Sequence, residues 1–190
     1  MGNIKSKSDP TKLTEKQIDL IAANTDFSPN EIKQWFCGFI RDCPNGLLDR
    51  KKFKEVTSHL FPGRKIDKFC DNSFRAFDQD NSGKIDFCEF MLAIAITQRG
   101  DLKSKLSAAF DMYDTDKNGV LDEKELINIL TTMYDLNGID DRKGDNSPKK
   151  KAKIIMSKID VTGDKKINRE EFISACVYDP YLRSALTVHE

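Results

Sequence analysis

A twelve-residue pattern that recurs along the chain constrains this sequence more than any other feature. Its first clear copy is Asp78–Glu89, DQDNSGKIDFCE. Oxygen-bearing side chains stand at positions 1, 3, 5 and 9, a glycine suited to a sharp turn stands at position 6, and a glutamate stands at position 12. Oxygen donors at this spacing suit Ca²⁺, and position 7 adds its backbone carbonyl. The predicted ligands are Asp78, Asp80, Ser82, Lys84 through its carbonyl, Asp86 and Glu89.

A second clear copy follows at Asp114–Glu125, DTDKNGVLDEKE. Its predicted ligands are Asp114, Asp116, Asn118, Val120 through its carbonyl, Asp122 and Glu125. Each of the two loops offers four carboxylates, which is consistent with affinities of about 10⁻⁷–10⁻⁵ M. We therefore expect two calcium sites, each with a helix on either side.

Two further copies of the pattern are degenerate. Asp160–Glu171 offers Asp160, Thr162, Asp164, Lys166 through its carbonyl, Asn168 and Glu171. Lys165 stands there at the glycine position, where a left-handed backbone costs about 1–2 kcal/mol. The sequence leaves open whether this loop binds calcium weakly. In the most upstream copy, residues 41–52, Arg41 and Lys52 replace the first and last carboxylates, so we expect no calcium there.

Four loops with flanking helices predict an all-α fold of four EF-hands in two paired lobes. We expect the position-8 residues to form short antiparallel β-bridges between paired loops, Leu48 with Ile85 and Leu121 with Ile167. The predicted organisation has four parts: an arm and short helix at 1–25, a first pair of hands at 26–99, a second pair at 100–178 and a tail at 179–190, which forms a last short helix from Pro180 to Leu186.

Local signals place several helix ends. Capping boxes at Thr14 and Ser28 predict helices that run to about Asn24 and Arg41. The helix after the third loop is expected to end near Tyr134, before a mobile, turn-rich loop at 137–148. The run Lys149, Lys150, Lys151 and Lys153 is typical of a solvated helix face, with a lipid or partner contact as the alternative.

Composition excludes several classes of function. The chain has 31 basic and 31 acidic side chains, only two histidines, and no Walker, G-x-S-x-G or H-E-x-x-H motif. We therefore predict neither an enzyme nor a nucleic-acid partner. The five cysteines form no CxxC pair, which favours reduced thiols and a cytoplasmic protein.

The first residues, MGNIKS, match the N-myristoylation pattern and assign the acyl group to Gly2. Lys5, Lys7, Lys12 and Lys16 follow, and each lysine near an anionic membrane adds about 1 kcal/mol to binding. One acyl chain needs such a second signal. We therefore predict a peripheral, reversibly membrane-associated protein; the alternative is an ordinary polar terminus.

Aromatic side chains are concentrated in the first half of the chain, where ten of the twelve Phe and the single Trp lie. This half holds more large apolar side chains than two short hands need for a core, and exposed apolar patches mark partner sites. We predict a groove that binds a helix of a target protein, lined by Trp35, Phe39, Phe53, Val56, Phe69, Phe90 and Ile94. The alternative is that these side chains form the core.

The combination of features resembles the neuronal calcium sensor family, EF-hand proteins of the recoverin and frequenin type. The resemblance rests on MGN at the start, on WFCGFIRDCPNG at residues 35–46, on the disabled first loop and on the three loops that follow. It implies a calcium sensor that is myristoylated at Gly2 and regulates a target protein at the membrane through a calcium-myristoyl switch. The glycine missing at Lys165 departs from the family pattern.

Two other functions stay open at this stage. One is a plain calcium buffer, which needs neither an acyl group nor an exposed groove. The other is a constitutive regulatory subunit of the calcineurin B type, although such subunits keep all four loops intact. The sequence also leaves open whether the chain forms a homodimer.

Overall fold

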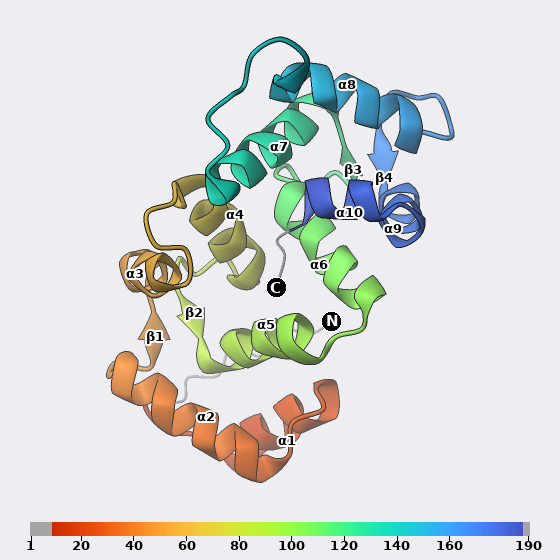
Figure 1. The fold of residues 1–190 in the computed structure, drawn as a ribbon. Coiled ribbons are helices and arrows are strands. Elements are labelled where there is room, and N and C mark those ends of the chain that lie inside the picture. Colours follow the sequence, from red (N-terminus) through yellow and green to blue (C-terminus); the bar gives the residue numbers. More distant parts are fainter. Residues whose placement is uncertain (1–8, 188–190) are drawn as a thin grey trace. The chain divides into compact units, whose positions relative to one another are not determined.

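The computed structural model describes residues 9–187, and within them the protein is mostly helical (Figure 1). The helices are α1 Glu15–Asn24, α2 Pro29–Asp42, α3 Arg50–Leu60, α4 Asp67–Phe77, α5 Phe87–Arg99, α6 Leu102–Tyr113, α7 Glu123–Asn137, α8 Pro148–Ile159, α9 Arg169–Tyr178 and α10 Pro180–Leu186, with a 3₁₀ turn, η1, at Gly144–Asn146. The strands are β1 Leu47–Leu48, β2 Ile85–Asp86, β3 Val120–Leu121 and β4 Ile167–Asn168. The predicted all-α EF-hand fold is confirmed.

The four short strands form two antiparallel pairs, one between each pair of loops. Leu48 is opposite Ile85 in the first pair, and Leu121 is opposite Ile167 in the second. Both predicted pairings are therefore confirmed. All four side chains are buried, so the ladder joins two loops through an apolar contact as well as through backbone bonds.

Side-chain caps set the start of several helices. Thr14 and Ser28 form the expected capping boxes with Gln17 and Glu31, and each satisfies amides that the first turn leaves without a partner. Asp122 does the same for α7 with Glu125. The predicted starts of α1 and α2 therefore agree with the structure, and their ends differ from it by at most one residue.

The end of α7 differs from the expectation. The helix continues past Tyr134 to Asn137 and stops at Gly138, whose left-handed backbone (φ 67°) closes the last turn. The segment after Gly138 makes side-chain contacts with α7. The Tyr134 hydroxyl lies 3.1 Å from Asn146 Oδ1, and Arg142 pairs with Asp135 at 2.6 Å.

Contacts divide the chain into two compact units. One unit contains the residues up to Arg50 together with Phe77–Arg99; the other contains Lys51–Ala76 together with the residues from Gly100 onward. The division between sequence-adjacent pairs of hands that we expected at residue 100 stays a prediction. Within the second unit, Cys70 of α4 and Ile66, which precedes this helix, are part of a buried cluster built mainly from α6–α10.

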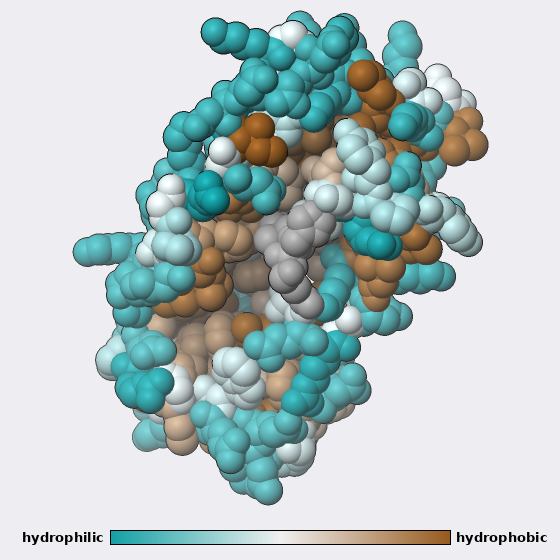
Figure 2. Space-filling view, in the orientation of Figure 1, coloured by the Kyte–Doolittle hydropathy of each residue, from teal (hydrophilic) through white to brown (hydrophobic). Residues whose placement is uncertain are grey.

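No helix within residues 9–187 is both long enough and apolar enough to span a membrane. The large apolar side chains that reach the surface lie on several short helices and in two of the loops. On α8 and the loop after it, Ile154 is 49 % exposed and Val161 is 84 % exposed, and Figure 2 shows hydrophobic side chains between hydrophilic ones over this helix.

Candidate metal centres

The second loop is organised by Asp78, which follows the last residue of α4 and is only 5 % exposed. Its carboxylate accepts bonds from the amides of Ser82 at 2.8 Å and Gly83 at 2.9 Å. Gly83 has φ 80°, a left-handed conformation that glycine adopts without steric cost. The side chain at position 1 thus holds the turn that brings the other oxygen donors around it.

Glu89 closes the same loop from the first turn of α5. Its carboxylate accepts bonds from the amides of Gln79 at 2.8 Å and Asp86 at 3.0 Å. Oxygen atoms of Asp78, Asp80 and Glu89 lie within 4.8 Å of one another. Burial raises the pKa of Glu89, and the negative charges of Asp86 and Asp80 raise it further. A bound cation would relieve this repulsion.

The third loop repeats this geometry. Asp114 is 5 % exposed and accepts the amide of Gly119 at 2.9 Å. Glu125, in the first turn of α7, is 6 % exposed and accepts the Thr115 amide at 2.7 Å. Oxygen atoms of Asp114, Asp116 and Glu125 lie within 4.8 Å of one another. Three converging carboxylates, one of them the glutamate at position 12, together with a carbonyl at position 7, fit a calcium ion.

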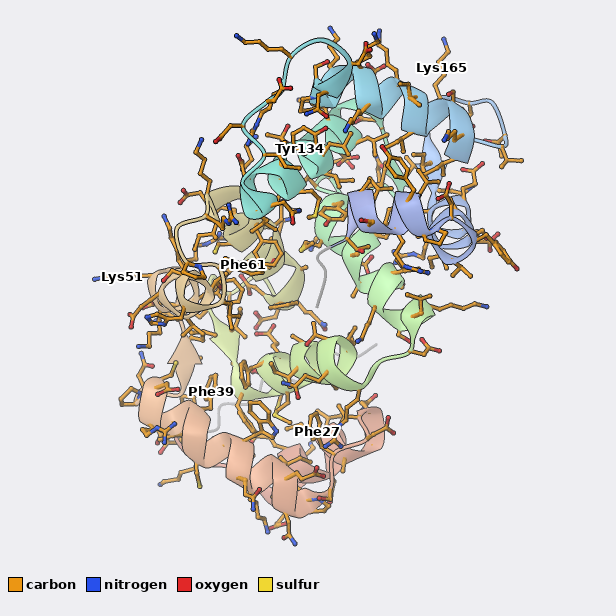
Figure 3. The ribbon with its side chains drawn as sticks, in the orientation of Figure 1. Phe27, Phe39, Lys51, Phe61, Tyr134 and Lys165 are labelled. Atoms are coloured by element: carbon orange, nitrogen blue, oxygen red, sulfur yellow. The ribbon has the colours of Figure 1, made fainter. Side chains whose placement is uncertain are left out.

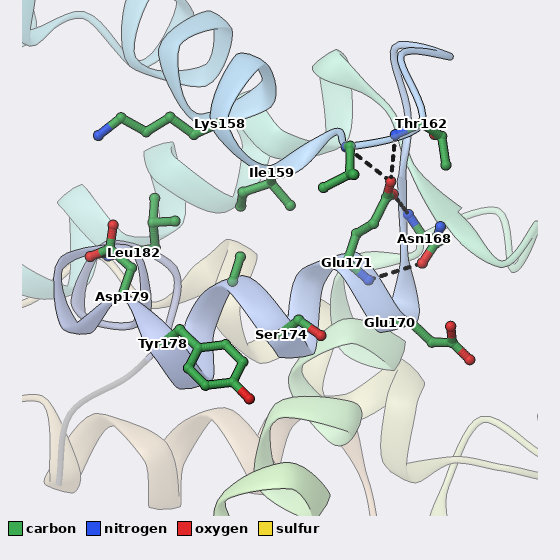
Figure 4. Close-up of a pocket in the computed structure, with 12 residues that line it drawn as sticks. Lys158, Ile159, Thr162, Asn168, Glu170, Glu171, Ser174, Tyr178, Asp179 and Leu182 are labelled. Atoms are coloured by element: carbon green, nitrogen blue, oxygen red, sulfur yellow. Dashed lines mark hydrogen bonds between the residues drawn. The ribbon is translucent and has the colours of Figure 1, made fainter.

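The fourth loop has similar, not identical, backbone bonds and fewer acidic groups. Glu171 accepts bonds from the amides of Val161 at 3.1 Å and Asn168 at 3.0 Å (Figure 4). Asp160 accepts the amides of Gly163 at 2.7 Å and Lys165 at 2.8 Å. Burial raises the pKa of Asp160, but these amide bonds outweigh burial, and the pKa is lowered overall.

Lys165 adopts the left-handed conformation expected at position 6, with φ 63°, and its side chain points away from the helices (Figure 3). Within the part of the chain that the structure describes, only the second and third loops bring three carboxylates this close together. Calcium at the fourth loop stays a prediction. A hollow of about 600 Å³ lies beside this loop between α8, α9 and α10 (Figure 4), with Glu171 and Tyr178 in its wall.

Sequence reasoning missed a second left-handed position in each of these three loops. Position 4 is Asn81 (φ 55°), Lys117 (φ 58°) and Gly163 (φ 78°). Asparagine and glycine favour this conformation, so two of the three loops carried a signal for it. Lys117 gave none, because lysine has no preference for a left-handed backbone.

The first loop is folded although its charges are wrong for calcium. Lys52, at position 12, pairs with Glu55 at 2.9 Å, and Arg41, at position 1, is exposed. Gly46 occupies the turn position with φ 73°. The expectation that this loop binds no calcium stays a prediction.

The predicted groove residues fall in both units. Trp35, Phe39, Phe90 and Ile94 belong to the first, and Phe53, Val56 and Phe69 belong to the second. Phe39 is the most buried, at 6 %, and lies between α2 and α5 (Figure 3), where its ring is 5.1 Å from that of Phe90. Val56 is 45 % exposed. Gly2, Lys5 and Lys7 lie outside the described residues.

Comparison with known proteins agrees with this geometry. A family model described as an EF-hand domain pair matches residues 103–177, and an EF hand domain matches residues 69–96. The chain is 32% identical to S-modulin of Aquarana catesbeiana over 93% of its own length and 88% of that protein. It is 30% identical to recoverin of Homo sapiens (91% and 86%) and 34% identical to neuronal calcium sensor 1 of Lymnaea stagnalis (94% and 94%).

Proposed function

Because the chain belongs to the neuronal calcium sensor family of EF-hand proteins, we propose that it is a calcium sensor that regulates a membrane-associated target protein. The proposal assigns calcium to the second and third loops, through the ligands predicted from the sequence, and leaves the fourth loop as a weaker third site.

One observation carries the proposal: in both clusters of carboxylates, the glutamate at position 12 lies in the first turn of the helix that leaves the loop. Glu89 belongs to α5 and Glu125 to α7. A bound calcium ion supplies two positive charges at the centre of such a loop. Glu89 and Glu125 would reach toward those charges and carry the starts of α5 and α7 with them, and movement of this kind exposes an apolar groove in sensor EF-hands.

The helices of the first pair of hands fall in both contact units. The helices α2 and α5 belong to one unit, and α3 and α4 belong to the other. The boundaries fall after Arg50, at the start of α3, and after Ala76, near the end of α4. We propose that calcium binding exposes the predicted groove for an amphipathic helix of the target.

Membrane association is the second part of the proposal. The N-terminal sequence supports an acyl group on Gly2, with basic side chains after it as the second signal that one acyl chain needs. The net charge of zero becomes positive as calcium is bound, because each ion adds two charges. Approach to an anionic, cytoplasmic membrane surface then becomes easier. Myristate exposure on calcium binding would make the association reversible.

A soluble calcium buffer is the second candidate. It needs the same two loops but no calcium-dependent apolar surface. Binding to a phenyl resin separates the two functions, since only a sensor exposes apolar surface when calcium is added.

The test combines calcium titration with retention on that resin. We expect Glu89→Gln and Glu125→Gln each to remove one of the two stronger binding steps and to reduce calcium-dependent retention. Glu123→Gln is the matched control, because Glu123 is an exposed acidic residue of the same first turn of α7 and lies outside the carboxylate cluster. Full retention by the Glu89→Gln and Glu125→Gln double variant would refute the sensor proposal.

A further inference from the structure

A tight turn at the N-terminal end of the described chain packs against the first, disabled loop. We propose that the first loop is a docking site whose occupant is the chain's own N-terminal arm, residues 9–13, and that Gly46 forms the contact surface. The arm, the first loop and the strands β1 and β2 all belong to one unit, so the contact lies within that unit.

The arm is shaped for docking by its own short-range bonds. The sequence Asp9-Pro10-Thr11-Lys12 has the composition of a type I turn, with aspartate first and proline second. Asp9 Oδ1 accepts the Thr11 amide at 3.0 Å and the Thr11 hydroxyl at 2.6 Å, and the Lys12 amide donates to the Asp9 carbonyl at 3.0 Å. The turn therefore presents the backbone of Pro10 as a formed surface.

In the first loop, Gly46 contacts this surface. No other residue can replace Gly46 without a shift of the backbone. Gly46 is buried, its amide donates to the Cys43 carbonyl at 2.8 Å, and its φ is 73°. A Cβ added at Gly46 would lie 2.2 Å from the Pro10 carbonyl oxygen and 2.4 Å from the Pro10 carbonyl carbon. Both of these atoms are backbone, so the clash cannot be relieved by a side-chain rotation.

The glycines at the same position of the calcium loops are different. A Cβ at Gly83 or Gly119 would meet no atom within 4 Å. Both glycines are needed for their left-handed backbone alone, whereas Gly46 is needed for its backbone and for the space that Pro10 fills. The loop that lost its calcium ligands is therefore the one whose turn is covered by another part of the chain.

The docking site lies next to the ladder that joins the two loops. Gly46 precedes Leu47, whose partner across the ladder is Asp86, a predicted calcium ligand. Figure 1 shows β1 and β2 side by side. Pro10 thus lies beside the strand pair that joins the first loop to the second. The disabled loop thus has a role besides pairing with the second loop: it holds the N-terminal arm, residues 9–13, in place.

The test uses two glycines with the same backbone angle. Gly63 also has φ 73°, but a Cβ there would meet no atom within 4 Å. Gly46→Ala and Gly63→Ala therefore carry the same left-handed strain, and only the first clashes with the arm. Hydrogen exchange of the Lys12 amide, measured by NMR, reports the stability of the turn, because this amide donates to the Asp9 carbonyl within it. Packing against the first loop stabilises the turn, so loss of that packing speeds the exchange.

In the calcium-free, non-acylated full chain, we expect Gly46→Ala to speed exchange at Lys12 about tenfold or more and Gly63→Ala to leave it unchanged. The chemical shifts of Leu48 and Ile85 check that the ladder is still paired in each variant. Equal exchange in all three proteins would overturn the proposal, as would equal acceleration by both substitutions. Since neither calcium nor the acyl group is present, the outcome does not depend on the proposed sensor function.

A second variant approaches the contact from the arm. Asp9→Ala removes the acceptor that holds the turn, so we expect tryptic cleavage after Lys12 to accelerate as it does in Gly46→Ala. Asp19→Ala, an exposed aspartate on α1, is the matched control. If both Asp9→Ala and Gly46→Ala are cleaved at the rate of the wild type, the arm is not held at the first loop.

Discussion

At the scale of single residues, Arg99 shows how one side chain can fasten two elements that are distant in sequence. It is the last residue of α5, and its guanidinium pairs with Glu31, in the first turn of α2. The same group lies 3.9 Å from the centre of the Phe27 ring. Cation–π contact and a charged hydrogen bond thus act together at the start of α2.

This contact has a consequence for acid stability. The Arg99 guanidinium, together with the Ser28 amide and hydroxyl, lowers the pKa of Glu31 from 4.5 to about 2. Because the folded-state pKa is depressed, the contribution of Glu31 to stability is complete above the unfolded value and is lost as pH falls toward 2. We expect Arg99→Ala to raise the pKa of Glu31 toward its ordinary value and to move acid unfolding to higher pH.

An NMR titration of the Glu31 carboxyl group measures this shift directly. Arg41→Ala serves as the control, since Arg41 is an exposed arginine on the same helix α2 with no contact to Glu31 among those described. A Glu31 pKa that stays near 2 in Arg99→Ala would show that the Ser28 bonds alone are sufficient.

At the scale of elements, the sequence predicted the helix starts and strand pairings that depend on interactions between residues close together in the chain or within one loop repeat. The capping boxes at Thr14 and Ser28 and the pairings of Leu48 with Ile85 and Leu121 with Ile167 follow from spacing within one helix turn or one loop repeat. The end of α7 did not follow, because Leu136 is buried in the core cluster and the last turn continues to Asn137, where the left-handed Gly138 ends the helix. The bond from Tyr134 to Asn146 could not be read from the sequence at all.

The fourth loop gives a prediction at this scale. Lys165 pays for a left-handed backbone that glycine would adopt freely, so Lys165→Gly should stabilise the calcium-free protein by about 1 kcal/mol and strengthen calcium binding at this loop. Lys166→Gly is the matched control: it removes the same charge at an adjacent position without a left-handed backbone and should be neutral or destabilising. Urea unfolding and calcium titration measure the two effects. Equal stability changes in both variants would show that charge, not backbone conformation, limits this loop.

At the scale of the whole molecule, the limit of sequence reasoning lies in contacts between distant segments. Repeats and loop spacing predicted four hands in two pairs, and the division at residue 100 stays a prediction; by contacts, α3 and α4 are grouped with the residues that follow Gly100. Arg75 of α4 donates to the Met112 carbonyl of α6 at 2.8 Å, and Ser73 lies 3.1 Å from the Met112 sulfur. Contacts of this kind depend on how α4 and α6 pack in the folded protein, and no local sequence pattern in either helix specifies them.

The membrane part of the proposed function is also tested at this scale, because it joins the N-terminal arm to the calcium loops. Acylated protein should sediment with vesicles of phosphatidylcholine and phosphatidylserine more in calcium than in chelator, and Gly2→Ala should lose most of that binding. A single myristoyl chain gives an association constant of only about 10⁴ M⁻¹, so lysines close to the surface have to add to it. Raising salt should therefore weaken the binding that remains. Equal sedimentation of the acylated protein and Gly2→Ala would mean that the chain reaches its target without the lipid anchor, and the two calcium loops would then act through the groove alone.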